Sequence, residues 1–280
     1  MRNLNNTLGA EIRKSRIISP VDGRGVVIAI DHGILMGPVR GLEDIEETVG
    51  QIVKGKPDAL QCTPPVANAI RENFLGRGAP ALIARIDTSN VWRSKPEPKE
   101  GYREMLFSVE EAIRAGADAV VVYMLFGYQE DREEGRNIAE IADVISRCQE
   151  YSMPCMVEPI GIAKGYQTVR DAELIPLACR IAFETGADIL KVDYTGNRET
   201  FSKAVDAANV PVLIRGGPKT ETVLEAYKMV KEALDAGAKG VVFGRNVWQS
   251  PEPAKAVMSY MRLVHDGISP EEAAKIQSRS

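Results

Sequence analysis

A lysine ends an apolar run in the segment "ADILKVDYTG", residues 187 to 196. The apolar residues from Ala187 to Leu190 predict a buried strand, and Lys191 follows them directly. If the strand ends meet in a mostly apolar mouth, burial there would disfavour the charged ammonium and lower its pKa. A neutral amine can attack a carbonyl carbon and form a Schiff base. The alternative is a strand-end lysine that extends to solvent, which is the commoner arrangement for a lysine considered by itself.

Residues at the ends of other predicted strands supply the proton donors and acceptors that Schiff-base chemistry needs. Asp31 and Glu158 are the carboxylates, and Tyr123 and Tyr194 are the phenols. An iminium formed on Lys191 would act as an electron sink for cleavage or formation of a carbon–carbon bond. These residue types therefore indicate chemistry on a carbonyl compound.

Two glycine-containing segments, "IRGGPKT" (214–220) and "VFGRNVWQ" (242–249), follow the last two predicted strands. Glycines let backbone N–H groups approach an anion, and the short helix expected after Gly244 would direct its N-terminus inward. The alternative is that these glycines serve ordinary strand-to-helix turns. Together with Lys191, they suggest a phosphorylated substrate that carries a carbonyl group.

Eight short apolar segments alternate with amphipathic helical segments along the chain. The strand segments are rich in Val, Ile and Leu without alternation, which is typical of parallel strands buried on both faces. Three helix ends are followed by "GADA", "GADI" or "GAKG", which then open the next strand. The predicted strands are residues 25–31, 57–63, 80–87, 118–125, 153–159, 188–194, 210–216 and 239–244.

About eight βα units in a chain of 280 residues predict a single α/β domain with the (β/α)8 TIM-barrel fold. A doubly wound open sheet is the alternative, but the segment after the first strand lacks the G-x-G-x-x-G pattern. We expect a helical N-terminal extension at 1–24, the barrel at 25–265 and a C-terminal helix at 266–280. The segment 93–101, "RSKPEPKEG", is the most loop-like insertion.

Composition excludes several other classes of protein. The net charge of −4 and the dispersed basic residues do not indicate nucleic-acid binding. The chain has no signal-peptide pattern and no apolar run long enough for a bilayer, so we expect a cytoplasmic protein without membrane contacts. Two histidines, His32 and His265, cannot build a three-histidine zinc centre, so we expect neither a metal nor a cofactor. The four cysteines are expected to be core residues.

The sequence resembles the archaeal-type class I fructose-bisphosphate aldolases and their relatives, which include aminodideoxyheptulosonate synthase and the autoinducer-2 phosphate thiolase. The resemblance runs from "IAIDHGILMGPVRGLEDI" through "LKVDYTG" and "RGGPKT" to "GVVFGRNVWQ". It implies a (β/α)8 barrel, often assembled into pentamer-based rings, so a pentamer or decamer is expected. It also implies that Lys191 forms the Schiff base and that Asp31 transfers protons. The residues that it implies for a substrate phosphate are Gly216, Gly217, Gly244 and Arg245.

The sequence also departs from this family. Many members carry a tyrosine general acid in a "YPRG"-like segment after the fifth strand, where this chain has "VEPIG". We therefore assign that role to Glu158, with pairing to Lys191 as the simpler alternative and Tyr123 or Tyr166 as the next candidates. Arg215 replaces a usually small residue and is expected to contact a second anionic group. The remaining candidate substrate contacts are His32, Arg85 and Asp193.

Three functions are compatible with these residues. A lyase would cleave a phosphorylated ketose, and a transferase on the same scaffold would pass a ketol or acyl unit to an acceptor. A non-enzymatic sugar-phosphate sensor would have no need of the combination of Lys191, Asp31 and Glu158. The sequence therefore predicts a Schiff-base aldolase acting on a phosphorylated ketose that resembles fructose bisphosphate, with a heptulosonate-synthase-type or thiolase-type transferase as the alternative.

Overall fold

A computed structural model describes residues 7–93, 95–96, 101–163, 168–217 and 220–278. Eight parallel strands form a closed barrel, because β6 pairs with both β3 and β7 and so joins the two ends of the strand order. The prediction of a TIM barrel is therefore confirmed. The barrel strands are β1 Gly25–Ala29, β2 Ala59–Cys62, β3 Ala81–Arg85, β6 Ala119–Phe126, β7 Cys155–Ile162, β9 Ile189–Asp193, β10 Val212–Arg215 and β11 Gly240–Phe243.

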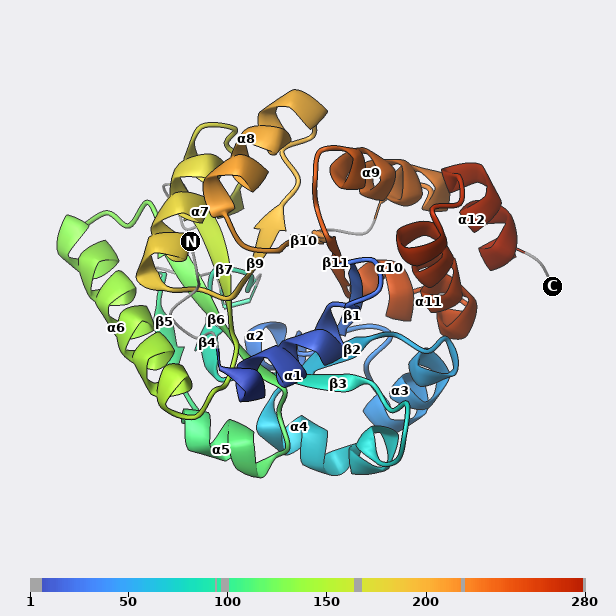
Figure 1. The fold of residues 1–280 in the computed structure, drawn as a ribbon, viewed down its shortest axis with the longest axis horizontal. Helices are drawn as coiled ribbons and strands as arrows, with labels where there is room; N and C mark the ends of the chain where they lie inside the picture. The colour runs from blue at the N-terminus through green and yellow to red at the C-terminus, as the bar shows by residue number, and fades with distance from the viewer. Residues whose placement is uncertain (1–6, 94, 97–100, 164–167, 218–219, 279–280) are drawn as a thin grey trace.

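Helices surround this barrel, as Figure 1 shows in a view along it. Those on its outer face include α3 Ile45–Lys54, α4 Pro64–Ala69, α5 Val109–Arg114, α6 Asp131–Glu150, α7 Leu174–Thr185, α8 Arg198–Ala208, α9 Val223–Asp235 and α11 Pro253–Met261. Short elements are α2 Gly33–Met36, η1 Arg71–Phe74, α10 Arg245–Trp248 and the π-helical turn η2 Arg262–Asp266. The chain's end adds α12 Pro270–Ser278, which packs on α9 and α11.

Successive side chains along each strand point alternately into two apolar layers. In β1, Val26 and Ile28 belong to the large cluster shared with the outer helices, while Val27 and Ala29 belong to the cluster inside the barrel. Because the period of a strand is two residues, the next inward position after Ala29 is Asp31. The same count on the other strands gives the residues at the carboxyl end of the barrel interior, namely Gln61, Arg85, Tyr123, Glu158, Lys191, Arg215 and Gly244.

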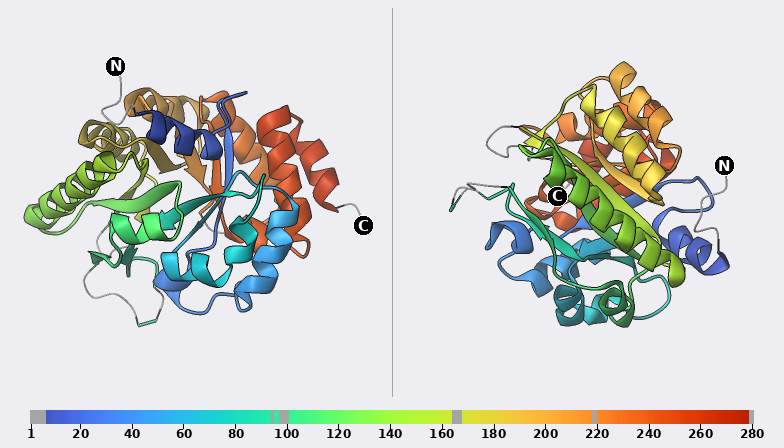
Figure 2. Two further views of the ribbon diagram at one scale, coloured as in Figure 1. Left: turned by 60° about the horizontal axis from the view of Figure 1, so that its bottom comes forward. Right: turned by 90° about the vertical axis from the view of Figure 1, so that its left-hand side faces the viewer.

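The N-terminal helix α1, Leu8–Ile17, lies across the opposite end of the barrel (Figures 1 and 2). Its last residue, Ile17, is fully buried in the interior cluster with Val27 and Ala59. Arg16 pairs with Asp118, just before β6, at 2.6 Å. The helix thus closes the end of the barrel away from the carboxyl ends of the strands.

The four cysteines are free and buried, as expected.

Two features were absent from the predicted element list. The first is a small antiparallel sheet of β4 Asp87–Ser89 and β5 Arg103–Met105, which lie before and after the segment 93–101. The second is a two-residue strand, β8 Thr168–Val169, which pairs antiparallel with the end of β7. Both elements are too short for periodicity to predict, and both bring side chains toward the carboxyl end of the barrel.

No helix in the described ranges has the length and apolar character that a bilayer crossing requires.

A histidine in η2 joins three segments at the N-terminal end of the barrel. His265 Nδ1 lies 2.7 Å from Asp22 Oδ2, and its Nε2 lies 2.9 Å from Asp58 Oδ2. Asp58 also accepts a hydrogen bond from the Val26 N–H group at the start of β1. Hydrogen bonding to Asp58, together with the negative charges of both aspartates, raises the pKa of His265 to about 9. The protonated imidazole therefore holds these segments together.

We expect replacement of His265 by Gln to destabilise the fold more at about pH 6 than at about pH 10. The pKa of His265 is higher in the folded state than in the unfolded chain, so its stabilising effect is complete below about pH 6.5 and disappears as the pH rises through about 9. Urea unfolding should show a loss on the order of 1–3 kcal/mol near pH 6. An equal loss at both pH values would contradict the role of the charge.

Candidate active site

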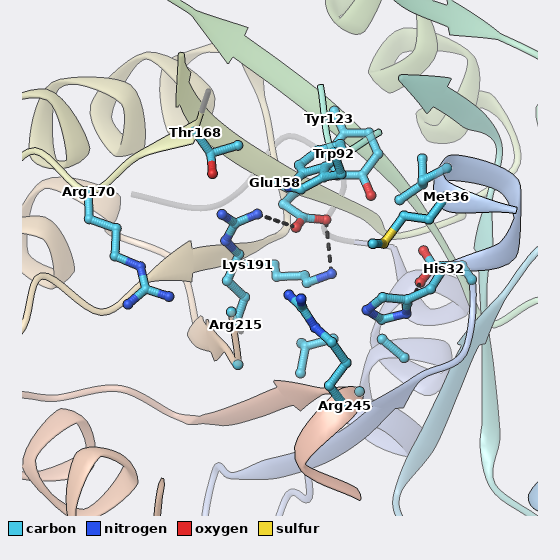
Figure 3. Close-up of a pocket in the computed structure, with 17 residues that line it drawn as sticks. His32, Met36, Trp92, Tyr123, Glu158, Thr168, Arg170, Lys191, Arg215 and Arg245 are labelled. Atoms are coloured by element: carbon cyan, nitrogen blue, oxygen red, sulfur yellow. Dashed lines mark ion pairs between the residues drawn. The ribbon is translucent and has the colours of Figure 1, made fainter. Parts of the chain in front are cut away.

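A cavity of about 500 Å³ opens at the carboxyl end of the barrel (Figure 3). Nine of its lining residues were predicted from the sequence as catalytic or phosphate-binding groups. These are Asp31, Tyr123, Glu158, Lys191, Arg215, Gly216, Gly217, Gly244 and Arg245, and the lining also includes the predicted substrate contact His32. The strands bring these side chains together because all their inward positions meet at one end of the barrel.

The side chain of Lys191 is 7% exposed and ends inside this cavity. Its Nζ lies 2.9 Å from Glu158 Oε2. Burial lowers the pKa of Lys191, while the negative charges of Glu158 and Asp31 oppose that change. The pKa of Lys191 is therefore lowered, as expected. The expectation of a mostly apolar mouth is wrong, because charged groups surround the amine.

Three cationic side chains contact the two carboxylate oxygens of Glu158. Its Oε2 contacts both Lys191 Nζ and Arg85 Nη2, and its Oε1 lies 3.5 Å from Arg215 Nη1. Burial by itself would raise the pKa of Glu158, but the charges of Lys191, Arg85 and Arg215 outweigh it and lower the pKa. A general acid, the role assigned to Glu158 from the sequence, would be favoured by a raised pKa, whereas the cations around Glu158 lower it. Glu158 is a carboxylate in the resting site.

Arg85 lies beneath the cavity, where its side chain is fully buried. Its Nε contacts Asp31 Oδ2 at 2.9 Å, its Nη1 contacts Asp87 Oδ1 at 3.0 Å, and its Nη2 contacts Glu158 Oε2 at 2.6 Å. Its guanidinium carbon also lies 3.7 Å from the centre of the Tyr123 ring. Arg85, which was predicted to contact substrate, is not among the residues that line the cavity. Instead, Arg85 fixes the positions of the two carboxylates that face the cavity.

Asp31 is held by Arg85 and by Gln61, whose Nε2 donates to Asp31 Oδ2 at 2.5 Å. Burial by itself would raise the pKa of Asp31, but the charges of Arg85 and Lys191 lower it to about 2. The neighbouring His32 has its pKa lowered to about 4, chiefly by burial. Its imidazole is therefore neutral near pH 7 and faces the cavity as a hydrogen-bonding group.

The candidate phenols occupy different environments. Tyr123 is almost fully buried, lines the cavity and packs against Trp92 at 4.6 Å between ring centres. Burial raises the pKa of Tyr123 well above its usual value, so its hydroxyl stays protonated. Tyr194 instead donates to Glu232, belongs to the outer core and is not among the residues that line the cavity. Tyr166 lies outside the described residues.

The opposite side of the cavity carries the candidate anion site. Arg245 is half-buried there, and its buried Nε has no hydrogen-bond partner within the described part of the chain. Gly217 adopts φ +60°, and a Cβ at this position would fall 1.9 Å from Arg170 Nη2. A Cβ on Gly244 would collide with His32, Ala29 and Trp248. The glycines at 217 and 244 are therefore required because neighbouring groups approach the backbone closely at these two positions.

Arg170 and Trp92 also line the cavity, and neither was predicted as a site residue. Arg170 follows the two-residue strand β8, and Trp92 lies between β4 and the segment 93–101. Asp193 was predicted to bind substrate, but it is buried and pairs with Arg215 at 2.7 Å and with Arg170 at 3.3 Å. Asp193 therefore orients these two cations.

Within the ranges that the structure describes, His, Cys, Asp and Glu do not form any group of three or more suited to a metal ion.

Comparison with known proteins places the site in a family. Residues 25–250 match the model of the DeoC/LacD family aldolases. The chain belongs to the DeoC/LacD family of aldolases. It is 45% identical to an uncharacterized aldolase of Saccharolobus solfataricus, over 96% of this chain and 99% of that protein. It is 32% identical to the 2-amino-3,7-dideoxy-D-threo-hept-6-ulosonate synthase of Halobacterium salinarum, over 95% of each chain.

A solved structure confirms the resemblance inferred from the sequence. It is an archaeal fructose-1,6-bisphosphate aldolase with its catalytic lysine covalently bound to the carbinolamine intermediate of the substrate. The two chains are 30% identical, and the match has a TM-score of 0.78 over 91% of this aldolase and 99% of that chain.

The contacts of Arg85 indicate that a positive charge alone at this position would not hold the three carboxylates in place. Arg85→Lys keeps the positive charge but loses the planar fork that reaches three carboxylates. We expect its kcat on an active substrate to fall by roughly two orders of magnitude, because misplaced catalytic groups are costly. Thermal unfolding serves as the control for folding, and a folded variant with unchanged kcat would contradict this account.

Proposed function

We propose that this aldolase acts through a Schiff base on Lys191 and cleaves or forms a carbon–carbon bond in a phosphorylated ketose. The observation that carries the proposal is the pair of Lys191 Nζ and Glu158 Oε2, 2.9 Å apart inside a cavity that Asp31 also lines. The archaeal relative with a carbinolamine on its catalytic lysine supports the same chemistry. A nucleophile beside a proton-accepting group is the arrangement that carbonyl addition requires.

Glu158 is suited to move the protons of Schiff-base formation. As a carboxylate, it takes a proton from the Lys191 ammonium, and the free amine attacks the ketose C2 carbonyl to give a carbinolamine. Glu158 returns this proton to the former carbonyl oxygen and then carries a second proton from the carbinolamine nitrogen to the same oxygen, which leaves as water and produces the iminium. The three hydrogens of the ammonium end as one on the iminium nitrogen and two in the water.

Asp31 is the candidate base for the cleavage step. It accepts the proton of the C4 hydroxyl while the C3–C4 bond breaks and its electron pair moves to the iminium nitrogen. The products are an aldehyde and an enamine on Lys191, which is then protonated at C3 and hydrolysed. A carboxylate with a pKa of about 2 is a weak base, so this proton moves together with bond cleavage. The Tyr123 hydroxyl stays protonated and is available as a hydrogen-bond donor.

The substrate phosphate is assigned to the side of the cavity with Arg245, Gly216, Gly217 and Gly244. Within the described residues the Arg245 guanidinium has no hydrogen-bond partner at Nε, and such a group is suited to an anion, as are backbone N–H groups in glycine turns. Arg215 is a weaker candidate, because Asp193 and Glu158 already neutralise it. Assembly into a pentamer or decamer and a cytoplasmic location remain predictions.

A transferase is the second candidate, because a relative at 32% identity is a heptulosonate synthase. The enamine on Lys191 would then attack an acceptor in place of being protonated. Product analysis with and without candidate acceptor aldehydes separates this reaction from simple cleavage.

Borohydride trapping with a panel of ketose phosphates tests the proposal directly. We expect mass spectrometry to find the reduced adduct on Lys191, because borohydride converts an iminium to a stable amine. Lys191→Ala should remain folded and lose at least about a thousandfold in kcat, as expected for a lost nucleophile. An adduct on another lysine, or turnover without any adduct, would refute the mechanism.

Glu158→Gln should bind substrate but form the Schiff base more slowly by roughly two to four orders of magnitude. The amide keeps the size of the side chain but cannot accept the amine proton. Single-turnover trapping over time measures the rate in both proteins, and thermal unfolding provides the control. Adduct formation at the wild-type rate would remove Glu158 from this role.

A further inference from the structure

We propose that Arg103 and Glu140, which lie outside the cavity, are positioning residues for the reaction. Arg103 holds Asp87 in the place from which Asp87 orients Arg85. Glu140 in turn holds Arg103. The inference rests on the proposed function, because its consequence is measured on the Schiff base of Lys191.

The hairpin of β4 and β5 brings Arg103 back to Asp87, which lies sixteen residues earlier in the chain. In its antiparallel register, Asp87 is opposite Met105 and Ser89 is opposite Arg103. Because alternate residues of a strand point to the same side, these four side chains share one face of the hairpin. Asp87 and Arg103 are buried on this face, whereas Glu104 on the other face is exposed.

The carboxylate of Asp87 accepts three hydrogen bonds from three strands. Its Oδ1 accepts from Arg85 Nη1 at 3.0 Å. Its Oδ2 accepts from Arg103 Nε at 2.8 Å and from the N–H group of Tyr123, in β6, at 2.7 Å. The side chain of Asp87 is fully buried, and among the described residues it is not one of those that line the cavity. Asp87 therefore fixes one end of the Arg85 guanidinium from outside the cavity.

Arg103 also balances the charge of Asp87. Arg85 shares its single charge among three carboxylates. Arg103 supplies a second cation to Asp87, so Arg85 remains available to the other two carboxylates. These are Asp31 and Glu158, which line the cavity. Without Arg103, the buried Asp87 would draw Arg85 toward itself, because an uncompensated buried charge is strongly unfavourable.

Glu140 connects Arg103 to α6 on the outside of the barrel, where α6 lies beside β5 (Figure 1). Arg103 Nη1 lies 2.9 Å from Glu140 Oε2, and Arg103 Nη2 contacts Met105 Sδ at 2.9 Å. The side chain of Arg103 is 0% exposed and that of Glu140 is 53% exposed, so this pair lies at the boundary with solvent. Asn137 of the same helix accepts a hydrogen bond from the N–H group of Leu125 in β6. Polar side chains thus attach α6 to both the hairpin and the barrel.

Arg103→Lys tests this role while keeping the positive charge. A lysine lacks the planar fork that donates to Asp87 and Glu140 together. We expect the rate of Schiff-base formation, measured by single-turnover borohydride trapping, to fall by about tenfold or more, with KM changed less than about threefold, because the carboxylates shift while the cavity lining is kept. Thermal unfolding is the control for folding, and a folded variant with the wild-type rate would overturn the inference.

A double-variant cycle distinguishes action through Arg85 from a general effect on the structure. If Arg103 acts through Arg85, the combination of Arg103→Lys with Arg85→Lys should stay within about twofold of the rate of Arg85→Lys alone. Independent effects of the two substitutions would instead multiply. A multiplied loss of rate would overturn the inference.

Glu140→Gln tests the outer end of these contacts, and Glu133→Gln is its matched control. Both glutamates lie on the exposed side of α6 and line the same surface groove, but only the first contacts Arg103 within the described part of the chain. We expect Glu140→Gln to lower the rate of Schiff-base formation by about two- to fivefold and Glu133→Gln to leave it unchanged. Because Glu140 is half exposed, this variant should fold even where Arg103→Lys does not. Equal rates in the two glutamine variants would overturn the role of Glu140.

Trapping with the wild-type enzyme separates two kinds of failure. If no ketose phosphate forms an adduct at Lys191, the proposed function fails, and this inference fails with it. If the wild-type enzyme forms the adduct and folded Arg103→Lys forms it at the same rate, the Schiff-base function stands and only the positioning role of Arg103 is overturned.

Discussion

The guanidinium of Arg85 donates to three carboxylates in a region that solvent does not reach. Two of them, Asp31 and Glu158, face the cavity, and the third, Asp87, is also bound by Arg103 and by the N–H group of Tyr123. Removing one member of such a buried cluster leaves an uncompensated charge, which typically costs about 3–5 kcal/mol. The positions of the proposed proton carriers therefore depend on a residue that does not touch the cavity.

The barrel explains why these charges can be buried at all. The lower layer of its interior is filled by small and branched side chains such as Val27, Ala59 and Ile83, and Ile17 of α1 closes the end below them. Two residues further along each strand, the next inward side chains of all the strands lie together in one layer. Opposite charges are thus brought within ion-pair distance by the fold, and they satisfy one another before any substrate arrives.

Much of this arrangement was predictable from the sequence, because short apolar strands repeat and end in polar residues. Lys191, Asp31 and Glu158 were identified by this pattern, and the structure brings them together. The pairing of side chains was not predictable. The sequence indicates that Arg85 ends a strand, but not that three carboxylates occupy its guanidinium or that Glu158 is surrounded by cations. Arg170 was missed because two residues of strand carry no periodic signal.

The central claim is that burial within this charged network keeps Lys191 poised to act as a nucleophile. Competitive labelling of the folded enzyme's amines with acetic anhydride across a range of pH, read by mass spectrometry, measures the pKa of Lys191 directly. We expect a pKa below the 10.5 of an ordinary lysine, because loss of hydration outweighs the attraction of Glu158 and Asp31. A pKa at or above 10.5 would show that the carboxylates hold the proton on Lys191 and would contradict the account.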